Sequence, residues 1–264
     1  MTLQAGGDPI LVARDGAIAT VTLNRPQKLN ALTKAMWRDL GVAVERLADD
    51  RELRCIVVRG AGERAFSPGN DIGEFARERA NKTQARDYGA FMHDTARALA
   101  ACPVPMVAQI HGICVGGGLE IAALCDLRIC GASSRFGAPI KNLGLVMAYA
   151  ELAPLVRLVG PDVALEILLE GRIFDAAEAK EKGLVTRVVA DDQVAAEAAA
   201  TAARIAEGAP LVARWHKKFA RRLASPTPIG EVEADECFDC FDTEDFRIGY
   251  AAFLAKQKPA FKGR

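Results

Sequence analysis

The most constraining feature of this sequence is the glycine run Gly116–Gly118 within HGICVGGGLEIAALCD. Glycine adopts positive φ angles and lets the backbone approach a ligand closely, but it interrupts regular structure. An apolar, helix-forming segment follows at once, and its one acid is Glu120. We therefore expect a strand, a glycine turn and a largely buried helix. A carboxylate inside such a helix is better explained as a functional group than as a surface residue.

A second glycine-containing passage from strand to helix lies at AFSPGNDIGEF, residues 65–75. The first N–H groups of a helix have no partner within the helix and attract negative charge. Two such helix ends that converge would form an oxyanion hole with two donors. Neither segment has the Lys-Ser/Thr pair of a phosphate-binding P-loop, and the GGG run lacks the dinucleotide-binding spacing.

The order of predicted elements indicates an α/β fold. Two apolar runs flank Asp15-Gly16, a hairpin signal, and an amphipathic helix follows Thr33, a plausible N-cap. The pattern of strand, strand and helix then repeats, and the chain ends in mostly helical sequence, so helices should cover stacked strands. We expect a core over residues 1–190 and a helical region over residues 191–264.

Composition narrows the function. The net charge of zero argues against a nucleic-acid partner. No apolar run approaches the roughly 20 residues of a membrane span, and the N-terminus lacks signal-peptide character.

The seven cysteines sit mostly in apolar contexts, which favours a reducing, cytoplasmic location. No metal site is expected, because CFDC (residues 237–240) has no second ligand pair. The basic run RWHKKFARR (residues 214–222) is interpreted as the solvated face of a helix.

Six segments, taken together and in order, resemble the enoyl-CoA hydratase/isomerase (crotonase) family. They are TLNRPQKLNALTKAMW, AFSPGNDIGEF, IHGICVGGGLEIAALCDLRIC, FGAPIKNLGL, GRIFDAAEAKEKGLVTRVV and EDFRIGYAAFLAKQKPAFKGR. The resemblance implies a crotonase-like spiral of ββα units with a helical C-terminal trimerisation region. It also implies a homotrimer or a dimer of trimers, and acyl-CoA thioester substrates of the kind found in fatty acid metabolism. Coenzyme A would be part of the substrate, so no separate cofactor is expected.

By matching positions, the resemblance implies that the N–H groups of Asn70 and Gly117 stabilise an enolate-like thioester oxygen. Such donors act mainly in the transition state, where charge develops. Asn70 stands where the family usually has a small residue, and asparagine tolerates left-handed geometry. Glu120 matches the first of two glutamates that family hydratases use as general acid and base.

The resemblance also implies residues that bind coenzyme A or the acyl group. Lys28 and Leu29 match one CoA-lining segment, and the run Asn70–Gly73 matches another. Within that run, Asp71 is expected to cap or brace the oxyanion-hole helix. Near the C-terminus, Phe253 and Lys256 match a segment that often approaches a neighbouring subunit's nucleotide. The substrate or CoA-binding set is Lys28, Leu29, Asp71, Ile72, Gly73, Ile140, Tyr149, Phe253 and Lys256.

The second family glutamate is missing, because Ile140 occupies its position. The glycine-rich run that usually follows is replaced by the bulkier MAYAELAPL, residues 147–155. Glu151 could replace the missing base if this segment begins a helix that points into the pocket, and Tyr149 could donate a proton or form a wall. We predict an enoyl-CoA hydratase, a carbon–oxygen lyase. The alternatives are an isomerase or an acyl-CoA hydrolase or decarboxylase that uses Glu120 alone, or a non-catalytic CoA-binding paralogue.

Overall fold

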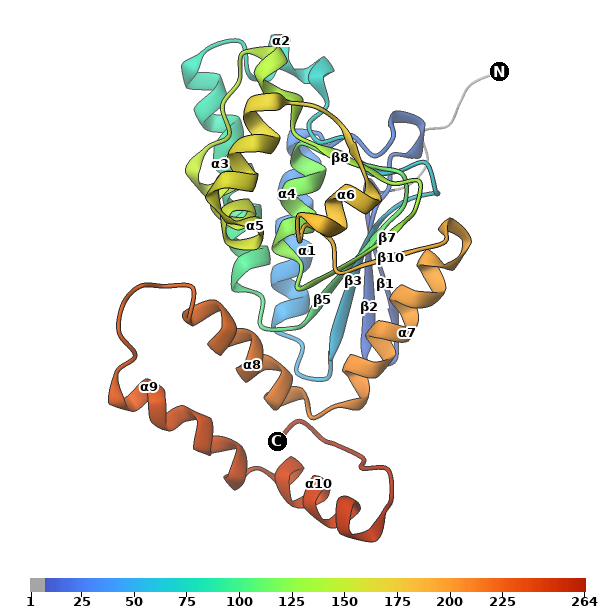
Figure 1. Ribbon diagram of the computed structural model, residues 1–264, viewed down its shortest axis with the longest axis vertical. Helices are drawn as coiled ribbons and strands as arrows, with labels where there is room; N and C mark the ends of the chain where they lie inside the picture. The colour runs from blue at the N-terminus through green and yellow to red at the C-terminus, as the bar shows by residue number, and fades with distance from the viewer. Residues whose placement is uncertain (1–7) are drawn as a thin grey trace.

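The computed structural model describes residues 8–264 and contains two β-sheets surrounded by helices (Figure 1). The larger sheet has the strand order β1-β2-β3-β5-β7-β10, and the smaller sheet has the order β4-β6-β8-β9. The strands are β1 (Ile10–Asp15), β2 (Ile18–Leu23), β3 (Cys55–Gly60), β4 (Ala65–Ser67), β5 (Met106–Ile110), β6 (Ile113–Val115), β7 (Leu127–Gly131), β8 (Arg135–Gly137), β9 (Phe174–Asp175) and β10 (Arg187–Val189). Only the β1–β2 and β8–β9 pairs are antiparallel.

The helices follow the strand pairs in a repeating order. The α-helices are α1 (Lys34–Ala48), α2 (Phe75–Glu78), α3 (Lys82–Ala101), α4 (Gly117–Leu124), α5 (Tyr149–Glu170), α6 (Ala176–Glu181), α7 (Val194–Glu207), α8 (Pro210–Arg222), α9 (Glu231–Asp235) and α10 (Glu244–Ala255). The 3-10 helices are η1 (Pro26–Lys28), η2 (Ile72–Glu74), η3 (Pro139–Leu143), η4 (Asp191–Gln193) and η5 (Glu236–Asp242). From β3 to β8, each ββα unit gives one strand to each sheet, so the chain winds as a spiral; β9 and β10 also join different sheets, with α6 between them.

The local predictions for the first unit are confirmed. The strands β1 and β2 pair as a hairpin around Asp15-Gly16, and Gly16 has the positive φ of 55° that the turn requires. The Oγ1 atom of Thr33 accepts a hydrogen bond from the N–H of Met36, so Thr33 caps α1. The α/β class is therefore correct, and it follows from the hydrophobic periodicity.

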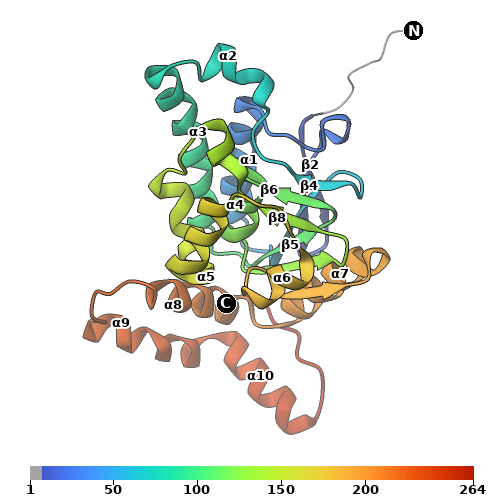
Figure 2. The same ribbon diagram turned by 45° about the horizontal axis from the view of Figure 1, so that its top comes forward.

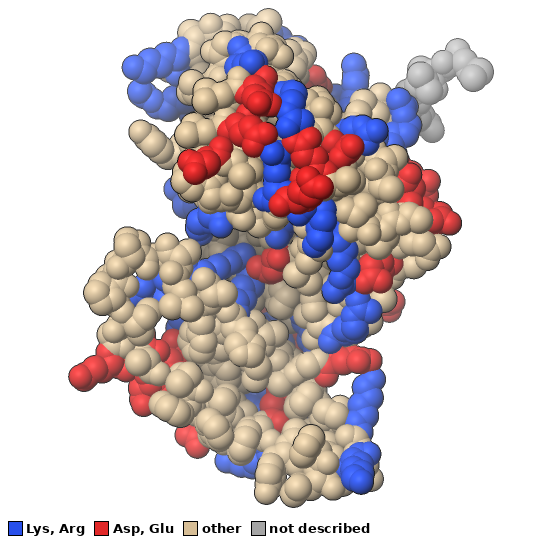
Figure 3. All heavy atoms as spheres, in the orientation of Figure 1, with Lys and Arg blue, Asp and Glu red and all other residues tan. Residues whose placement is uncertain are grey.

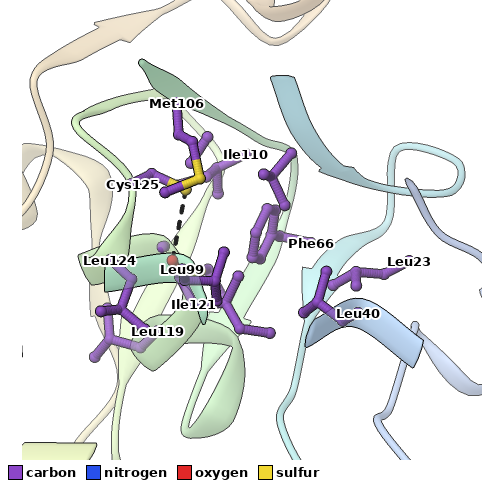
Figure 4. Packing of buried hydrophobic residues seen from close by; sticks show 14 of the residues in the cluster. Leu23, Leu40, Phe66, Leu99, Met106, Ile110, Leu119, Ile121, Leu124 and Cys125 are labelled. Atoms are coloured by element: carbon purple, nitrogen blue, oxygen red, sulfur yellow. Dashed lines mark hydrogen bonds between the residues drawn. The ribbon is translucent and has the colours of Figure 1, made fainter. Parts of the chain in front are cut away.

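The main core lies between the larger sheet and the helices α1, α3, α4 and α5. Its fully buried side chains include Phe66 from β4, Leu99 from α3 and Ile121 from α4 (Figure 4). On the opposite face of the larger sheet, α7 packs against Val57 and Val107 (Figure 1). The sheet is thus covered on both faces, which explains why its central strands are continuous apolar runs.

The basic face of α8 differs from the sequence interpretation. Rather than facing solvent, Lys217 is buried and donates to the carbonyl oxygen of Val104 at 2.6 Å, and its Nζ lies 2.7 Å from Asp126. Arg221 also pairs with Asp126, at 3.2 Å. These cations pair with a carboxylate and carbonyl oxygens just beyond the C-terminus of α3, where positive charge is favourable. These contacts attach α8 to the underside of the core, as oriented in Figure 2.

The helices α9 and α10 extend away from the sheets, beyond α8 (Figures 1 and 2). This agrees with a helical C-terminal region, and the boundary at residue 190 stays a prediction. None of the helices over residues 8–264 combines the length and the hydrophobicity that a membrane-spanning segment needs.

Candidate active site

A cavity of about 370 Å³ opens where the smaller sheet meets α3, α4 and α5. Its walls come from segments that are far apart in the sequence: the loop after β4, the start of α4, η3 and the start of α5. The lining residues are Ala31, Pro68, Asn70, Asp71, Ile72, Phe75, Arg79, Met92, Val115, Gly116, Gly117, Glu120, Pro139, Ile140, Leu143, Leu145, Val146 and Glu151. The wall is mainly apolar, with a few polar groups, as in typical ligand sites.

The backbone N–H groups of Asn70 and Gly117, both in this wall, have no hydrogen-bond partner among the described residues. Gly117 is the first residue of α4. Gly69, with a φ of 94°, holds the two segments together: a Cβ there would lie 2.6 Å from the nitrogen of Gly117. The glycine therefore allows a close approach that any side chain would prevent. The pair has the form of an oxyanion hole.

The side chain of Asn70 is not part of this donor pair and contacts other residues instead. Its Oδ1 accepts a hydrogen bond from the indole Nε1 of Trp37 at 2.6 Å, and its Nδ2 lies 3.7 Å from the sulfur of Met92. The backbone of Asn70 is not left-handed, so tolerance of that geometry does not explain the residue. Gly69 takes the positive φ instead, and the Asn70 amide fixes the loop through Trp37.

Glu120 lies one turn into α4 and lines the cavity. Burial and the nearby Glu151 carboxylate raise the pKa of Glu120 to about 8, against a smaller opposing effect of Arg79. Burial disfavours the charged form, and so does a neighbouring like charge. Glu120 is therefore mostly protonated near neutral pH and can donate a proton.

Glu151 faces Glu120 from the first turn of α5. Its side chain is 12 % exposed, and its Oε2 accepts a hydrogen bond from the N–H of Ala148 at 3.0 Å. Its Oε1 lies 3.4 Å from Nε2 of His93 on α3, and this buried nitrogen has no hydrogen-bond partner among the described residues. The N-terminus of α5 thus holds one oxygen of Glu151, and the imidazole lies beside the other.

A sequence model of a known family, described as Enoyl-CoA hydratase/isomerase, matches residues 13–264. The chain belongs to the enoyl-CoA hydratase/isomerase family. It is 37 % identical over 259 residues to a probable enoyl-CoA hydratase of Mycobacterium bovis, with 97 % of this chain and 99 % of the relative covered. It is 32 % identical over 255 residues to a crotonyl-CoA hydratase of Syntrophomonas wolfei, with 96 % and 97 % covered.

The solved structures of this family share the fold. A crystal structure described as an enoyl-CoA hydratase/carnithine racemase from Magnetospirillum magneticum is 54 % identical, with a TM-score of 0.96 and coverage of 98 % of this chain and 97 % of that chain. The expected spiral of ββα units is therefore the fold of this family member.

The structure brings together the centre of the predicted site. Asn70, Gly117, Glu120 and Glu151 all line the cavity, as do Asp71, Ile72 and Ile140. Asp71 also braces the loop as expected: it caps η2 by accepting from the N–H of Gly73, and it pairs with Arg25 at 2.8 Å. That hydrogen bond with Arg25 lowers the pKa of Asp71.

The structure does not support the predicted role of Tyr149 in the pocket. Its side chain is 94 % exposed and does not line the cavity, so it is neither a pocket wall nor placed to donate a proton. It is the first residue of α5, and the turn that directs Glu151 inward leaves Tyr149 outside.

The remaining predicted contacts lie outside the cavity wall. Lys28, Leu29 and Gly73 belong to or flank the short helices η1 and η2. Phe253 and Lys256 lie at the end of α10, are exposed to solvent and do not line the cavity. The helix α10 lies at the opposite end of the molecule from α2 (Figure 1). Their contacts with coenzyme A stay predictions.

Sequence reasoning did not identify Arg79 or His93. The only sequence signal for His93 is its place beside Met92, on a helix whose buried face can be read from the periodicity. Arg79 follows a short charged helix and looks like a surface residue in the sequence.

Proposed function

We propose that the chain is an enoyl-CoA hydratase that adds water across the α,β double bond of an acyl-CoA thioester. The observation that carries this proposal is one cavity in which two unbonded N–H groups lie with two carboxyl groups. The hydratase names of its relatives support the same activity.

The N–H groups of Asn70 and Gly117 donate hydrogen bonds to the thioester oxygen. In the neutral substrate this oxygen carries little charge, but attack at the β-carbon moves the double-bond electrons onto it. The donors therefore stabilise the enolate more than the substrate, which is how a prearranged pair accelerates the reaction.

The two carboxyl groups divide the proton transfers. Glu151 removes a proton from water as the water oxygen bonds to the β-carbon. Glu120, protonated because of its raised pKa, then delivers a proton to the α-carbon as the enolate electrons return. Two carboxyl groups in different environments are a common basis for assigning acid and base. One proton returns from Glu151 to Glu120 to complete the cycle.

His93 acts through Glu151 as a positioning residue. It does not itself line the cavity, but its Nε2 lies 3.4 Å from Oε1 of Glu151, which does. The Ala148 N–H holds the other carboxylate oxygen, and we propose that the nearby imidazole limits the remaining orientations of this carboxylate. In this proposal, Glu151 takes the role of the second family glutamate, whose position in this sequence is occupied by Ile140.

The enzyme is proposed to work as a trimer or a dimer of trimers. Its C-terminal region exposes many large apolar side chains, and uncharged surface covers much of this region (Figure 3). These side chains are Leu223, Ile229, Val232, Phe238, Phe241, Phe246, Tyr250, Phe253 and Leu254. Extended apolar surfaces of this kind are typical of interfaces between subunits.

The test is hydration of crotonyl-CoA, followed through the loss of absorbance of the conjugated thioester. We expect turnover by the unaltered enzyme and a large loss in Glu120→Gln. Double-bond migration without hydration in a 3-enoyl-CoA would instead support an isomerase. Absence of any reaction with enoyl-CoA thioesters that bind would refute the catalytic proposal.

A further inference from the structure

Arg79 gives the cavity a positive charge that the mechanism above does not use. It is the residue that ends α2, and it lines the same cavity as Glu120. Its guanidinium carbon lies 4.8 Å from the centre of the Phe75 ring and 5.0 Å from the centre of the Tyr88 ring. Contacts with two aromatic rings restrict the guanidinium while its N–H groups remain available at its edge.

The acids near Arg79 are occupied elsewhere. Arg79 forms no ion pair with any carboxylate in residues 8–264. Glu78, next to Arg79 in the sequence, pairs with Lys34 at 3.1 Å. Glu74 lies one turn earlier, and its Oε2 accepts hydrogen bonds from the N–H of Lys34 at 2.8 Å and from the hydroxyl of Tyr88 at 3.2 Å. Asp71 pairs with Arg25.

The two acids of the cavity do not neutralise Arg79 either. Glu120 is kept mostly protonated near neutral pH by its raised pKa. Glu151 is held by the N–H of Ala148 and lies beside His93. The half-buried guanidinium of Arg79 therefore lines the cavity without a carboxylate partner from the described residues, and it is free to pair with a carboxylate on a ligand.

We propose that the acyl group of the substrate carries its own carboxylate and that Arg79 binds it. The substrate class is then the CoA thioesters of unsaturated dicarboxylic acids, a refinement that rests on the proposed hydratase function. Guanidinium and carboxylate match in geometry and form paired, charge-assisted hydrogen bonds. The same charge disfavours an acyl group that ends in a quaternary ammonium.

Binding of three saturated thioesters tests this assignment without any turnover. Glutaryl-CoA, pentanoyl-CoA and 4-(trimethylammonio)butanoyl-CoA share the CoA portion but end in an anion, a methyl group and a cation. Calorimetry should show that the enzyme binds glutaryl-CoA about 10- to 100-fold more tightly than pentanoyl-CoA, the range for a hydrogen-bonded charge pair. The cationic thioester should bind most weakly.

Two variants locate the effect. Arg79→Gln should bind glutaryl-CoA and pentanoyl-CoA with nearly equal affinity, and Arg79→Lys should keep part of the preference. Arg77→Gln is the matched control, because Arg77 is an exposed arginine on α2 that does not line the cavity. It should leave the preference unchanged, and circular dichroism verifies the folding of each variant.

Several results would overturn the assignment. Equal affinity of the unaltered enzyme for glutaryl-CoA and pentanoyl-CoA, or no binding of either, would refute it. A uniform loss for all three thioesters in Arg79→Gln would show that Arg79 contacts the CoA phosphates instead. A preserved preference for glutaryl-CoA in an enzyme that hydrates no enoyl-CoA would refute only the proposed hydratase function.

Discussion

At the scale of single residues, the chemistry depends on a carboxyl group that keeps its proton. Glu120 owes this raised pKa to its burial and to the nearby carboxylate of Glu151. The pH dependence of the reaction therefore reports on the protonation of Glu120.

The first prediction concerns the pH profile. Because the protonated form of Glu120 donates to the α-carbon, kcat/KM for hydration should fall as the pH rises through about 8. Steady-state rates over a range of pH measure this. A rate that stays constant well above pH 8 would contradict the role of Glu120 as the acid.

The second prediction concerns stability. Glu120 binds its proton more tightly in the folded state than in the unfolded state, so wild-type stability falls as the pH rises from about 4.5 to about 8. Glu120→Gln cannot ionise. It should therefore be more stable than the wild type by roughly 1–3 kcal/mol above pH 8, and this advantage should shrink towards acid pH. Urea denaturation at both ends of the range checks the sign; a gap independent of pH would contradict it.

The third prediction concerns His93. His93→Ala should lower kcat by about 10-fold or more with little change in KM, because a loosely oriented base loses rate rather than binding. It should also change the pH profile, which a purely structural defect would not do, and His93→Gln should restore part of the rate. An unchanged profile in a folded His93→Ala enzyme would remove His93 from the mechanism.

At the scale of secondary structure elements, α4 and α5 position the two carboxyl groups. The sequence allowed Glu120 to be predicted more firmly than Glu151. Gly117 and Glu120 could be predicted because the glycine run and the helix that follows it are local features. Glu151 was only one of two candidates, since the direction of the first turn of α5 depends on how this helix packs against α3 and η3. The contact with His93 and the aromatic neighbours of Arg79 join separate elements, so no local pattern reveals them.

The basic face of α8 shows the same limit. An amphipathic pattern identifies the helix, but it does not tell whether charged residues face water or buried carbonyl groups. Lys217 meets Asp126 and a carbonyl oxygen in the core only because α8 crosses beneath α3.

The fourth prediction follows from that anchor. Lys217→Met should lower the free energy of unfolding by up to about 3 kcal/mol, because it leaves carbonyl and carboxylate groups with fewer partners. Lys218→Met is the matched control: it removes an exposed pair with Glu236 and should cost less than about 1 kcal/mol. Equal losses in the two variants, measured by denaturant unfolding, would show that Lys217 is not an anchor.

At the scale of the whole molecule, the apolar surface of the C-terminal region is exposed in the single chain and is proposed to be buried between subunits. The family fold could be predicted because six matching segments occur in order along nearly the whole chain. The assembly could not be derived in the same way, since a single chain contains only one side of each interface.

The fifth prediction is the assembled state. Sedimentation should give a mass of three or six chains. Phe246→Glu should shift the mass towards the single chain, because a charge in an apolar interface lacks a partner. A monomer at micromolar concentration in the unaltered protein would contradict the proposed assembly.

The most direct test of the central claim compares hydration rates of the unaltered enzyme, Glu120→Gln and Glu151→Gln with an enoyl-CoA that all three bind. Our account predicts that each substitution lowers kcat by about 10²–10⁴-fold, the usual contribution of a general acid or base. It also predicts that affinity for the thioester is retained. Full activity in Glu151→Gln would show that the second carboxyl group has no part in the reaction and would contradict the paired mechanism.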